Sequence, residues 1–206
     1  MKYTDNTFAE LIGVLSSKAA VPGGGAASAL VGEVGIALGS MVGNLTVGKK
    51  KYADVEEDVI LLIEKAAEIQ KKLQDLVDED VAAFEPLSKA YSIPKDEPGR
   101  AEIMEEALRI AAATPLEIMR ASARAIELQG EFANKGSVLA VSDAGVGALC
   151  CKAALQGAGL NVFINTKMMA DREYAAAVES EADALLEKYC QMADGIYESV
   201  YARLRT

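Results

Sequence analysis

The feature that most restricts the fold is a run of small residues from 26 to 45, where glycines recur every three or four positions. These glycines are Gly32, Gly35, Gly39 and Gly43. At this spacing they share one face of a helix, which is left almost without side chains. The sequence therefore predicts a helix that packs very close to a neighbour. That neighbour is either a second small-residue helix, predicted over residues 144–155, or another copy of the chain.

Helical periodicity extends through the rest of the chain. It is clearest over residues 54–91, where apolar residues step alternately by four and three positions, as in a long amphipathic helix. Further helices are predicted over residues 8–17, 100–129 and 171–203. The fold is therefore predicted to be all-α, a multi-helical bundle with long amphipathic helices. At this length the chain is expected to form a single domain, residues 1–206.

Proline, glycine and capping residues suggest where the later helices begin and end. Pro115 is expected to kink the second long helix, or to begin a new helix capped by Thr114. Gly130 is expected to end it. Ser142 or Asp143 can then cap the second small-residue helix, which would start at the next residue.

The segment 160–166, LNVFINT, alternates in a way that also suits a short strand. An isolated strand would have no pairing partner in a chain that is otherwise helical. A helical turn is therefore favoured, and it would place Asn161 and Asn165 on one face, four residues apart.

Composition excludes several classes of partner and chemistry. A formal net charge of −10 argues against binding to nucleic acid or to an anionic membrane surface. The apolar run near residue 35 is built from Ala and Gly and contains Glu33, so it is interpreted as a buried helix and not as a membrane span. The chain has no histidine, which removes the commonest zinc ligand and every serine–histidine or cysteine–histidine mechanism. We expect no metal site.

Three cysteines and the first residues bear on the compartment. The cysteines, Cys150, Cys151 and Cys190, have no metal-ligand spacing, and adjacent cysteines rarely bond to each other. Residues 1–17 are polar and amphipathic, unlike a signal peptide. These observations favour a reduced, cytoplasmic protein.

One charged residue interrupts the apolar stripe of the helix over residues 54–91. Asp80 lies on that stripe, and its neighbours one turn away are Leu73, Leu76, Val77, Ala83, Phe84 and Leu87. Asp78 lies on a different face and is expected to be solvated. Because burying an unpaired carboxylate costs several kcal/mol or keeps it protonated, Asp80 is predicted to be either paired or chemically useful.

Polar residues gather around glycines in two places. The turn Pro22–Gly23–Gly24–Gly25 precedes the first small-residue helix, whose free N–H groups suit an anion or a polar acceptor. Lys49, Lys50, Lys51 and Tyr52 follow the same helix, where cations are favourable at a helix C-terminus and can also attract an acidic ligand. The second place, residues 131–147, contains Asn134, Ser142 and Asp143.

Five segments together carry a resemblance to a known family. They are PGGGAASAL, NLTVGKKKY, LVDEDVAAF, NKGSVLAVSDAGVGAL and LNVFINT, in this order along almost the whole chain. The chain resembles the formiminotransferase-cyclodeaminase C-terminal family. That family includes the cyclodeaminase domain of the bifunctional enzyme and stand-alone bacterial methenyltetrahydrofolate cyclohydrolases.

The resemblance implies an all-helical homodimer with its long helices packed across a two-fold axis, and a tetrahydrofolate derivative as substrate. It places the folate between the glycine turn and the lysine-rich helix end, and it makes Asp78 or Asp80 the acid–base group. The periodicity of the helix independently selects Asp80. The lysines would hold the acidic tail of a folate, with one glutamate or several (a polyglutamylated folate), and the resemblance also allows a formiminotransferase as a partner.

Substrate-binding residues are predicted from both arguments together. They are Pro22, Gly23, Gly24, Gly25, Lys49, Lys50, Lys51, Tyr52, Asn134, Ser142, Asp143, Asn161 and Asn165. For the last five a purely structural role stays open, with Asp143 as a helix cap and Asn161 or Asn165 as a turn residue. The alternative function is a folate-binding or helical assembly protein without catalysis. A nucleotide-binding loop is disfavoured because the glycine turn lacks the P-loop pattern.

Overall fold

The structure is a computed structural model and describes residues 3–205; residues 1, 2 and 206 of the predicted domain lie outside the described part. Six α-helices and three short 3₁₀ helices make up this part of the chain, which contains no strand. The helices are α1 (Phe8–Leu15), α2 (Gly24–Asn44), α3 (Glu56–Tyr91), α4 (Arg100–Lys135), α5 (Val141–Thr166) and α6 (Arg172–Arg205). The 3₁₀ helices are η1 (Tyr3–Asp5), η2 (Lys50–Tyr52) and η3 (Val138–Ala140). The predicted all-α fold is confirmed.

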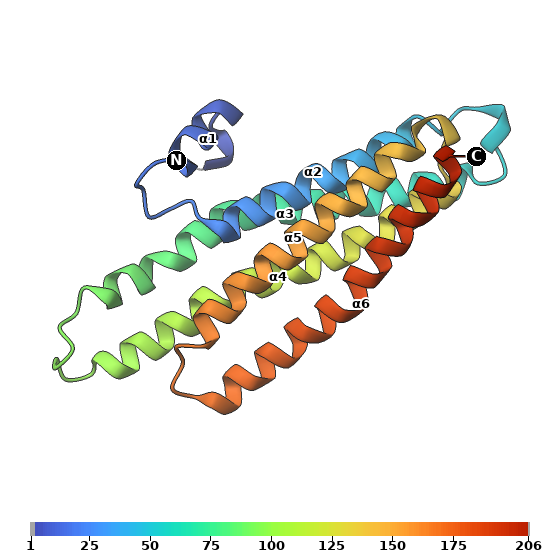
Figure 1. The fold of residues 1–206 in the computed structure, drawn as a ribbon. Helices are drawn as coiled ribbons and strands as arrows, with labels where there is room; N and C mark the ends of the chain where they lie inside the picture. Colours follow the sequence, from blue (N-terminus) through green and yellow to red (C-terminus); the bar gives the residue numbers. More distant parts are fainter. Residues whose placement is uncertain (1–2, 206) are drawn as a thin grey trace.

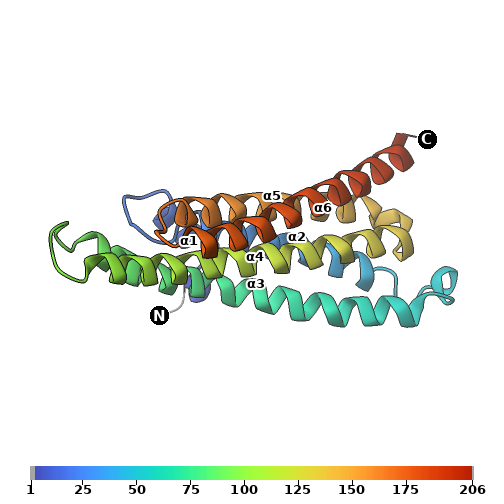
Figure 2. The same ribbon diagram turned by 90° about the horizontal axis from the view of Figure 1, so that it is seen from below.

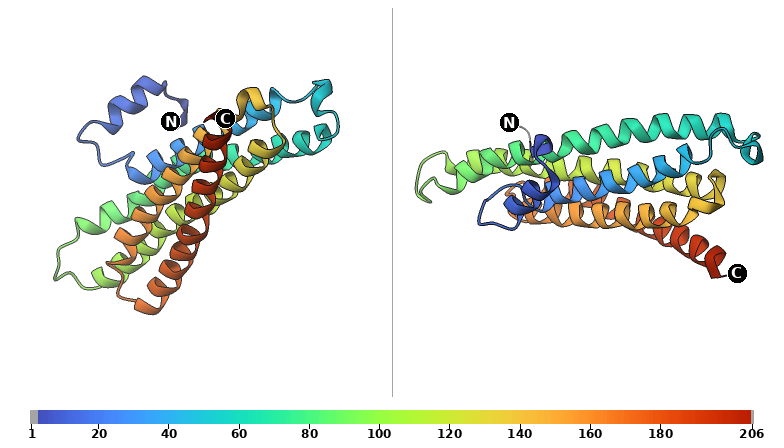
Figure 3. Two further views of the ribbon diagram at one scale, coloured as in Figure 1. Left: turned by 45° about the vertical axis from the view of Figure 1, so that its right-hand side comes forward. Right: turned by 90° about the horizontal axis from the view of Figure 1, so that it is seen from above.

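Five long helices, α2 to α6, lie side by side in an elongated bundle (Figure 1). Seen at right angles, α3 forms one side of the bundle and α5 and α6 the other, with α4 between them (Figure 2). The short helix α1 lies outside the bundle, beside the beginning of α2. The loop before α3 and the loop between α3 and α4 lie at opposite ends of the molecule (Figure 3).

The close neighbour of α2 is α5 of the same chain. A Cβ atom on Gly35 would lie 2.9 Å from the carbonyl oxygen of Gly147 and 2.6 Å from the Sγ of Cys151. One turn earlier, a Cβ on Gly32 would lie 3.2 Å from the Cβ of Ala154. The glycine face predicted from the sequence is therefore where two helix backbones approach within a distance that no larger residue allows.

A buried amide joins these two helices to α4. Gln129 is fully buried, and its Nε2 donates a hydrogen bond of 2.7 Å to the carbonyl oxygen of Gly35. The same amide occupies the space where a Cβ on Gly39 or Gly147 would lie. The small residues thus leave room for one polar side chain at the centre of the core.

The second long helix does not end at Gly130 and no new helix begins at Pro115, so these two expectations are wrong, while the alternative of a kink at Pro115 stays a prediction. Helix α4 continues through Pro115 and Gly130 to Lys135. Gly130 faces Ile196 of α6 at ordinary contact distance, so packing outweighs the low helix propensity of glycine. Pro115 cannot donate to the carbonyl of Ala111, but the side chain of Asn165 donates to that oxygen instead, at 2.9 Å.

Helix α5 is longer than predicted at both ends. It begins at Val141 after Ala140 and continues to Thr166 as one helix, so Ser142 and Asp143 lie in its first turn and do not cap it. The short-strand alternative for LNVFINT is wrong, and the favoured helical arrangement of Asn161 and Asn165 is confirmed.

The outer faces of α2 and α5 are apolar and exposed. The exposed side chains include Val31, Val34, Met41 and Leu45 on α2 and Val146, Leu149, Leu160 and Ile164 on α5. By length and hydropathy, the segments Gly24–Asn44 and Val138–Thr166 are each able to cross a membrane, but half of each is already buried inside the bundle. Exposed apolar side chains gathered on two neighbouring helices are typical of an interaction surface.

The contact between α2 and α5 can be tested with Gly35→Ala. We expect this variant to lower the free energy of unfolding by about 1–3 kcal/mol, because the new methyl group has a backbone oxygen and a buried sulfur in its way. Gly195→Ala on α6 is the control, since Gly195 is exposed and a Cβ there meets nothing within 4 Å. It is expected to stabilise by up to about 1 kcal/mol. Equal effects of the two variants in urea unfolding would contradict the close contact.

Candidate active site

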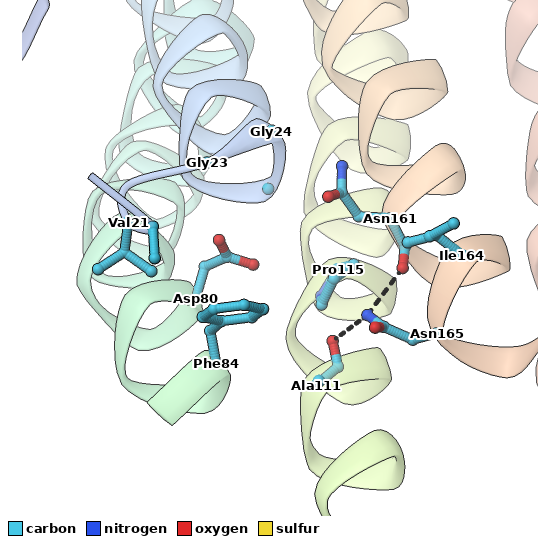
Figure 4. A pocket seen from close by; sticks show the side chains of 12 residues that line it. Val21, Gly23, Gly24, Asp80, Phe84, Ala111, Pro115, Asn161, Ile164 and Asn165 are labelled. Carbon is cyan, nitrogen blue, oxygen red and sulfur yellow. Dashed lines mark hydrogen bonds between the residues drawn. The ribbon is translucent and has the colours of Figure 1, made fainter. Parts of the chain in front are cut away.

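A cavity of about 140 Å³ lies at the beginning of α2, and α3 and α4 extend beyond it (Figure 4). The segment before α2, the first turn of α2, and helices α3, α4 and α5 all contribute to its wall. The lining residues are Ala20, Val21, Gly23, Gly24, Gly25, Asp80, Phe84, Ala111, Pro115, Asn161, Ile164 and Asn165. Asp80 and Phe84 lie on one side of it, and Ala111, Asn161 and Asn165 on the other.

Asp80 is the only charged residue among those lining residues. Its Oδ2 accepts a hydrogen bond of 2.8 Å from the backbone N–H of Ala26, in the first turn of α2. Helix N-termini expose N–H groups without a partner in the helix and carry partial positive charge, so a carboxylate is favourable here. Asp80 therefore has one backbone partner while still facing the cavity.

Two of the three consecutive glycines, Gly24 and Gly25, are needed for the space that they leave. None of the three has a positive φ, and α2 already begins at Gly24. A Cβ on Gly25 would overlap the carboxylate of Asp80, and a Cβ on Gly24 would lie 3.1 Å from the Nδ2 of Asn161. What these positions require is space for two polar side chains, and not an unusual backbone conformation.

Two opposing effects set the protonation of Asp80. Burial raises the pKa of its carboxyl group above the ordinary aspartate value, and the hydrogen bond from the N–H of Ala26 lowers it. Burial is the larger effect, so the net pKa is raised. A carboxyl group of this kind can donate a proton nearer neutral pH than an exposed aspartate can.

Asn165 is held in one orientation. Its Nδ2 donates to the carbonyl oxygens of Ala111 and Asn161, both at 2.9 Å, which uses both of its hydrogens. The carbonyl of Ala111 is available because Pro115 has no N–H. The Oδ1 of Asn165 is then left as an acceptor beside the cavity. Asn161 is fixed similarly, with its Nδ2 donating to the carbonyl of Gly157 at 2.8 Å.

The prediction that Asp78 is solvated is wrong. Its two carboxylate oxygens accept hydrogen bonds from the backbone N–H of Tyr3 at 2.6 Å and from the hydroxyl of Thr4 at 2.7 Å. It is half-buried and does not line the Asp80 cavity. Of the two aspartates in the family motif, only Asp80 therefore faces the cavity. The two residues are two positions apart, so their side chains point to different sides of α3.

The remaining predicted binding residues lie at the other end of the bundle. Helix α2 has 21 residues, so about 30 Å separates the glycines at its start from Lys49, Lys50 and Lys51 after its end. Asn134, Ser142 and Asp143 lie at the junction of α4 and α5. The lysine-rich segment contacts this junction through hydrogen bonds with Ser137 and Val138. One chain therefore does not bring the glycine turn and the lysines together.

This lysine-rich end is itself an ordered cluster. The Nζ of Lys49 donates to the hydroxyl of Ser137 at 3.3 Å, and the hydroxyl of Tyr52 accepts from the backbone N–H of Val138 at 3.0 Å. The hydrogen bond from Val138, with smaller contributions from Ser137 and two of the lysines, lowers the pKa of Tyr52. All three lysines are exposed.

Several lining residues were not predicted. Phe84 lies one turn after Asp80 in the same motif, and that spacing is a signal that could have indicated it. Ala20, Val21, Ala111, Pro115 and Ile164 carry no such signal, because only the packing of helices distant in sequence brings them to the cavity. Within residues 3–205, no group of three or more His, Cys, Asp or Glu side chains is placed to hold a metal ion.

Comparison with known proteins decides the family. The family model for formiminotransferase-cyclodeaminase matches residues 7–184. The chain belongs to the formiminotransferase-cyclodeaminase family. The resemblance predicted from the five sequence segments is confirmed.

Similar proteins include enzymes of two kinds. The methenyltetrahydrofolate cyclohydrolase of Methylorubrum extorquens is 39% identical over 194 residues, which cover 92% of this chain and 93% of the relative. The formimidoyltransferase-cyclodeaminase of Sus scrofa is 33% identical over 96% of this chain, but the chain spans only 37% of that longer protein. The crystal structure of formiminotetrahydrofolate cyclodeaminase from Thermotoga maritima superposes with a TM-score of 0.82 at 31% identity, covering 95% of this chain and 98% of that one.

The space around Asp80 can be tested with Gly25→Ala. The new methyl group would overlap the carboxylate, so we expect both a loss of about 1–3 kcal/mol in unfolding free energy and a displaced Asp80. Gly23→Ala is the control, because a Cβ at Gly23 meets nothing within 4 Å and its φ of −121° suits alanine. Similar thermal unfolding of the two variants would show that Asp80 does not lie against Gly25.

Proposed function

We propose that this protein is a folate-dependent one-carbon enzyme. It acts as a formimidoyltetrahydrofolate cyclodeaminase, as a 5,10-methenyltetrahydrofolate cyclohydrolase, or as both. The observation that carries this proposal is the carboxyl group of Asp80, which has a raised pKa and faces a small cavity at a helix N-terminus. Full-length similarity to a methenyltetrahydrofolate cyclohydrolase and a cyclodeaminase structure supports the choice of substrate.

In the cyclodeaminase reaction, N10 of the folate attacks the formimino carbon carried on N5. The tetrahedral intermediate then expels its exocyclic nitrogen as ammonia and leaves cationic 5,10-methenyltetrahydrofolate. The departing nitrogen needs a proton, which the protonated Asp80 supplies. The carboxylate that remains then faces the newly formed cation and stabilises it.

In the cyclohydrolase reaction, water adds to the methenyl carbon of the same cationic folate, and the adduct opens when one of its two C–N bonds breaks, so that the released nitrogen takes up a proton and a formyl group remains on the other nitrogen. Asp80, now as the carboxylate, accepts a proton from that water. One side chain therefore serves both reactions in different protonation states. No step of either reaction, as proposed, draws on a metal ion.

The cavity is suited to the reacting part of a folate and not to the whole molecule. At about 140 Å³ it is close to the roughly 150 Å³ cavity that accommodates a benzene-sized ligand. A pterin edge fits such a volume, and the rest of the folate must extend outside it. The fixed Oδ1 of Asn165 would accept from a ring N–H, while the first-turn N–H groups of Gly24 and Gly25 would donate.

We further propose a homodimer in which each folate site is shared. The exposed apolar faces of α2 and α5 suit a second copy of the chain packed against them. A two-fold axis perpendicular to α2 would reverse the second α2, so that its lysines lie near the first copy's glycine turn. This arrangement accounts for the 30 Å separation within one chain, and it lets Lys49, Lys50 and Lys51 bind the acidic tail of a folate that carries one glutamate or several.

The setting and partners of the enzyme belong to the same proposal. Free cysteines support a cytoplasmic location. The bifunctional relatives support a formiminotransferase that works with this chain. A non-catalytic folate-binding protein is the second candidate, but the raised pKa of Asp80 favours catalysis, since binding alone does not need it.

Asp80→Asn tests the catalytic role directly. Asparagine can still accept from the N–H of Ala26, so the fold should be preserved, while turnover should fall by roughly 10²–10⁴-fold because the proton donor is lost. Loss of the absorbance of 5,10-methenyltetrahydrofolate measures the cyclohydrolase reaction, and ammonia release from formiminotetrahydrofolate measures the cyclodeaminase reaction. A wild-type protein inactive in both assays, or an active Asp80→Asn variant, would contradict the proposal.

The pH profile of the wild type serves as a further control on the same variant. The cyclodeaminase needs the acid form, so its rate should fall as pH rises through the raised pKa of Asp80. The cyclohydrolase needs the carboxylate, so its rate should rise through the same pKa. The residual activity of Asp80→Asn should show neither of these two dependences on pH.

The shared site can be tested by subunit complementation. Lys49→Ala/Lys50→Ala/Lys51→Ala alone should weaken binding of polyglutamylated folate more than that of the monoglutamate. Co-expression of this triple variant with Asp80→Asn should give heterodimers that each contain one intact site, restoring about a quarter of wild-type sites in a random mixture. If each site lay within one chain, each intact Asp80 of the heterodimer would share its site with substituted lysines, and turnover at low concentrations of polyglutamylated folate would not rise above that of the triple variant alone.

A further inference from the structure

The wall of the Asp80 cavity includes one segment that is not helical. Residues 16–23 join α1 to α2, and we call this segment the strap. Its Ala20 and Val21 line the cavity. The same two residues also line a neighbouring groove of about 480 Å³ between the strap and α3. The strap and Phe84 of α3, which also lines both, therefore separate the cavity from this groove, so the position of the strap affects how closed the cavity is.

The contacts that hold the N-terminal segment in place converge on Asp78. Each oxygen of its carboxylate accepts a hydrogen bond, one from the N–H of Tyr3 and the other from the hydroxyl of Thr4. These bonds join η1 to α3 across more than seventy residues of sequence. Hydrogen bonds to a charged acceptor are among the stronger ones, so Asp78 fixes the start of the described chain on α3.

Tyr3 connects η1 to the strap. Its hydroxyl donates a long hydrogen bond of 3.5 Å to the carbonyl oxygen of Val21, and its side chain lines the groove together with Val21. Helix α1 continues the connection, since Leu11 and Leu15 border the same small cavity as Pro22 at the end of the strap. The strap is thus supported by residues whose own position depends on Asp78.

We propose that Asp78 is a positioning residue for the reaction at Asp80: it anchors η1 and thereby holds the strap over the cavity, so that Val21 closes around the bound folate. This inference rests on the proposed function. Asp78 has no part in proton transfer, because both of its oxygens are occupied and it lies outside the cavity. The two aspartates of the motif then have separate duties, one chemical and one structural.

Two substitutions break the anchor from opposite sides. In Asp78→Asn, one oxygen becomes an NH₂ group that cannot accept from either donor. In Thr4→Val, the carboxylate is intact and only the hydroxyl donor is lost. Both variants should raise KM, by about tenfold for Asp78→Asn and less for Thr4→Val, with kcat within about twofold of the wild type. Asp80→Asn should show the opposite pattern, a loss of kcat.

A protease can report on the strap without any substrate. Lys18 is exposed and lies within the strap, so trypsin cleavage after Lys18 measures how often the strap opens. We expect cleavage about tenfold faster in Asp78→Asn than in the wild type, at an unchanged melting temperature. Glu79→Gln is the matched control, because it removes an exposed charge from the neighbouring position on α3 and should leave both cleavage and kinetics unchanged.

The outcomes separate the two proposals. A large loss of kcat in Asp78→Asn with a normal Thr4→Val would mean that Asp78 acts in the chemistry and would overturn the positioning role. Wild-type rates of cleavage after Lys18 in Asp78→Asn would overturn the anchor. A wild-type protein that converts neither folate would overturn the proposed function, while the cleavage result would still decide whether Asp78 holds the strap.

Discussion

The close approach of α2 and α5 is the constraint on which the rest of this structure depends. At Gly35 the two helices leave no room for even one methyl group, and the amide of Gln129 occupies space that Gly39 and Gly147 leave open. Protein interiors are packed like crystals, so a helix held in this way has little freedom to shift or rotate. The beginning of α2 is consequently presented in a fixed position to the side chain of Asp80.

At that position the site depends on a balance of two effects. Burial favours the neutral form of Asp80, while the N–H of Ala26 favours the carboxylate. A group that is stabilised partly in each form can donate a proton in one reaction and accept one in another. Pro115 contributes on the opposite wall, because the carbonyl that it leaves free fixes the amide of Asn165. Neither the hydrogen bond to Asp80 nor the one that fixes Asn165 requires a residue with a positive φ.

The length of α2 has a consequence for how the enzyme assembles. About 30 Å separates the glycine end of the helix from its lysine end, so a folate that used both would need the lysines of a second copy. The exposed apolar face of α2 and α5 and the net charge of −10 fit the same arrangement. Apolar contact would bring two acidic chains together, and the lysines would collect an anionic ligand that the rest of the surface repels.

Some properties of this protein follow from the sequence by itself, because they depend on periodicity along a single helix. The all-α fold, the limits of α3 and the choice of Asp80 over Asp78 as the residue facing the cavity are of this kind. Other properties depend on contacts between distant segments, which no local pattern contains. Helix α4 continues through Pro115 and Gly130 because α5 and α6 contact it there. Asp78 accepts two hydrogen bonds because Tyr3 and Thr4 fold back onto α3. The sequence alone also showed which segments contain polar residues close to glycines along the chain. Only the tertiary structure decided that they form two clusters at opposite ends of the bundle, since the direction and length of α2 separate them.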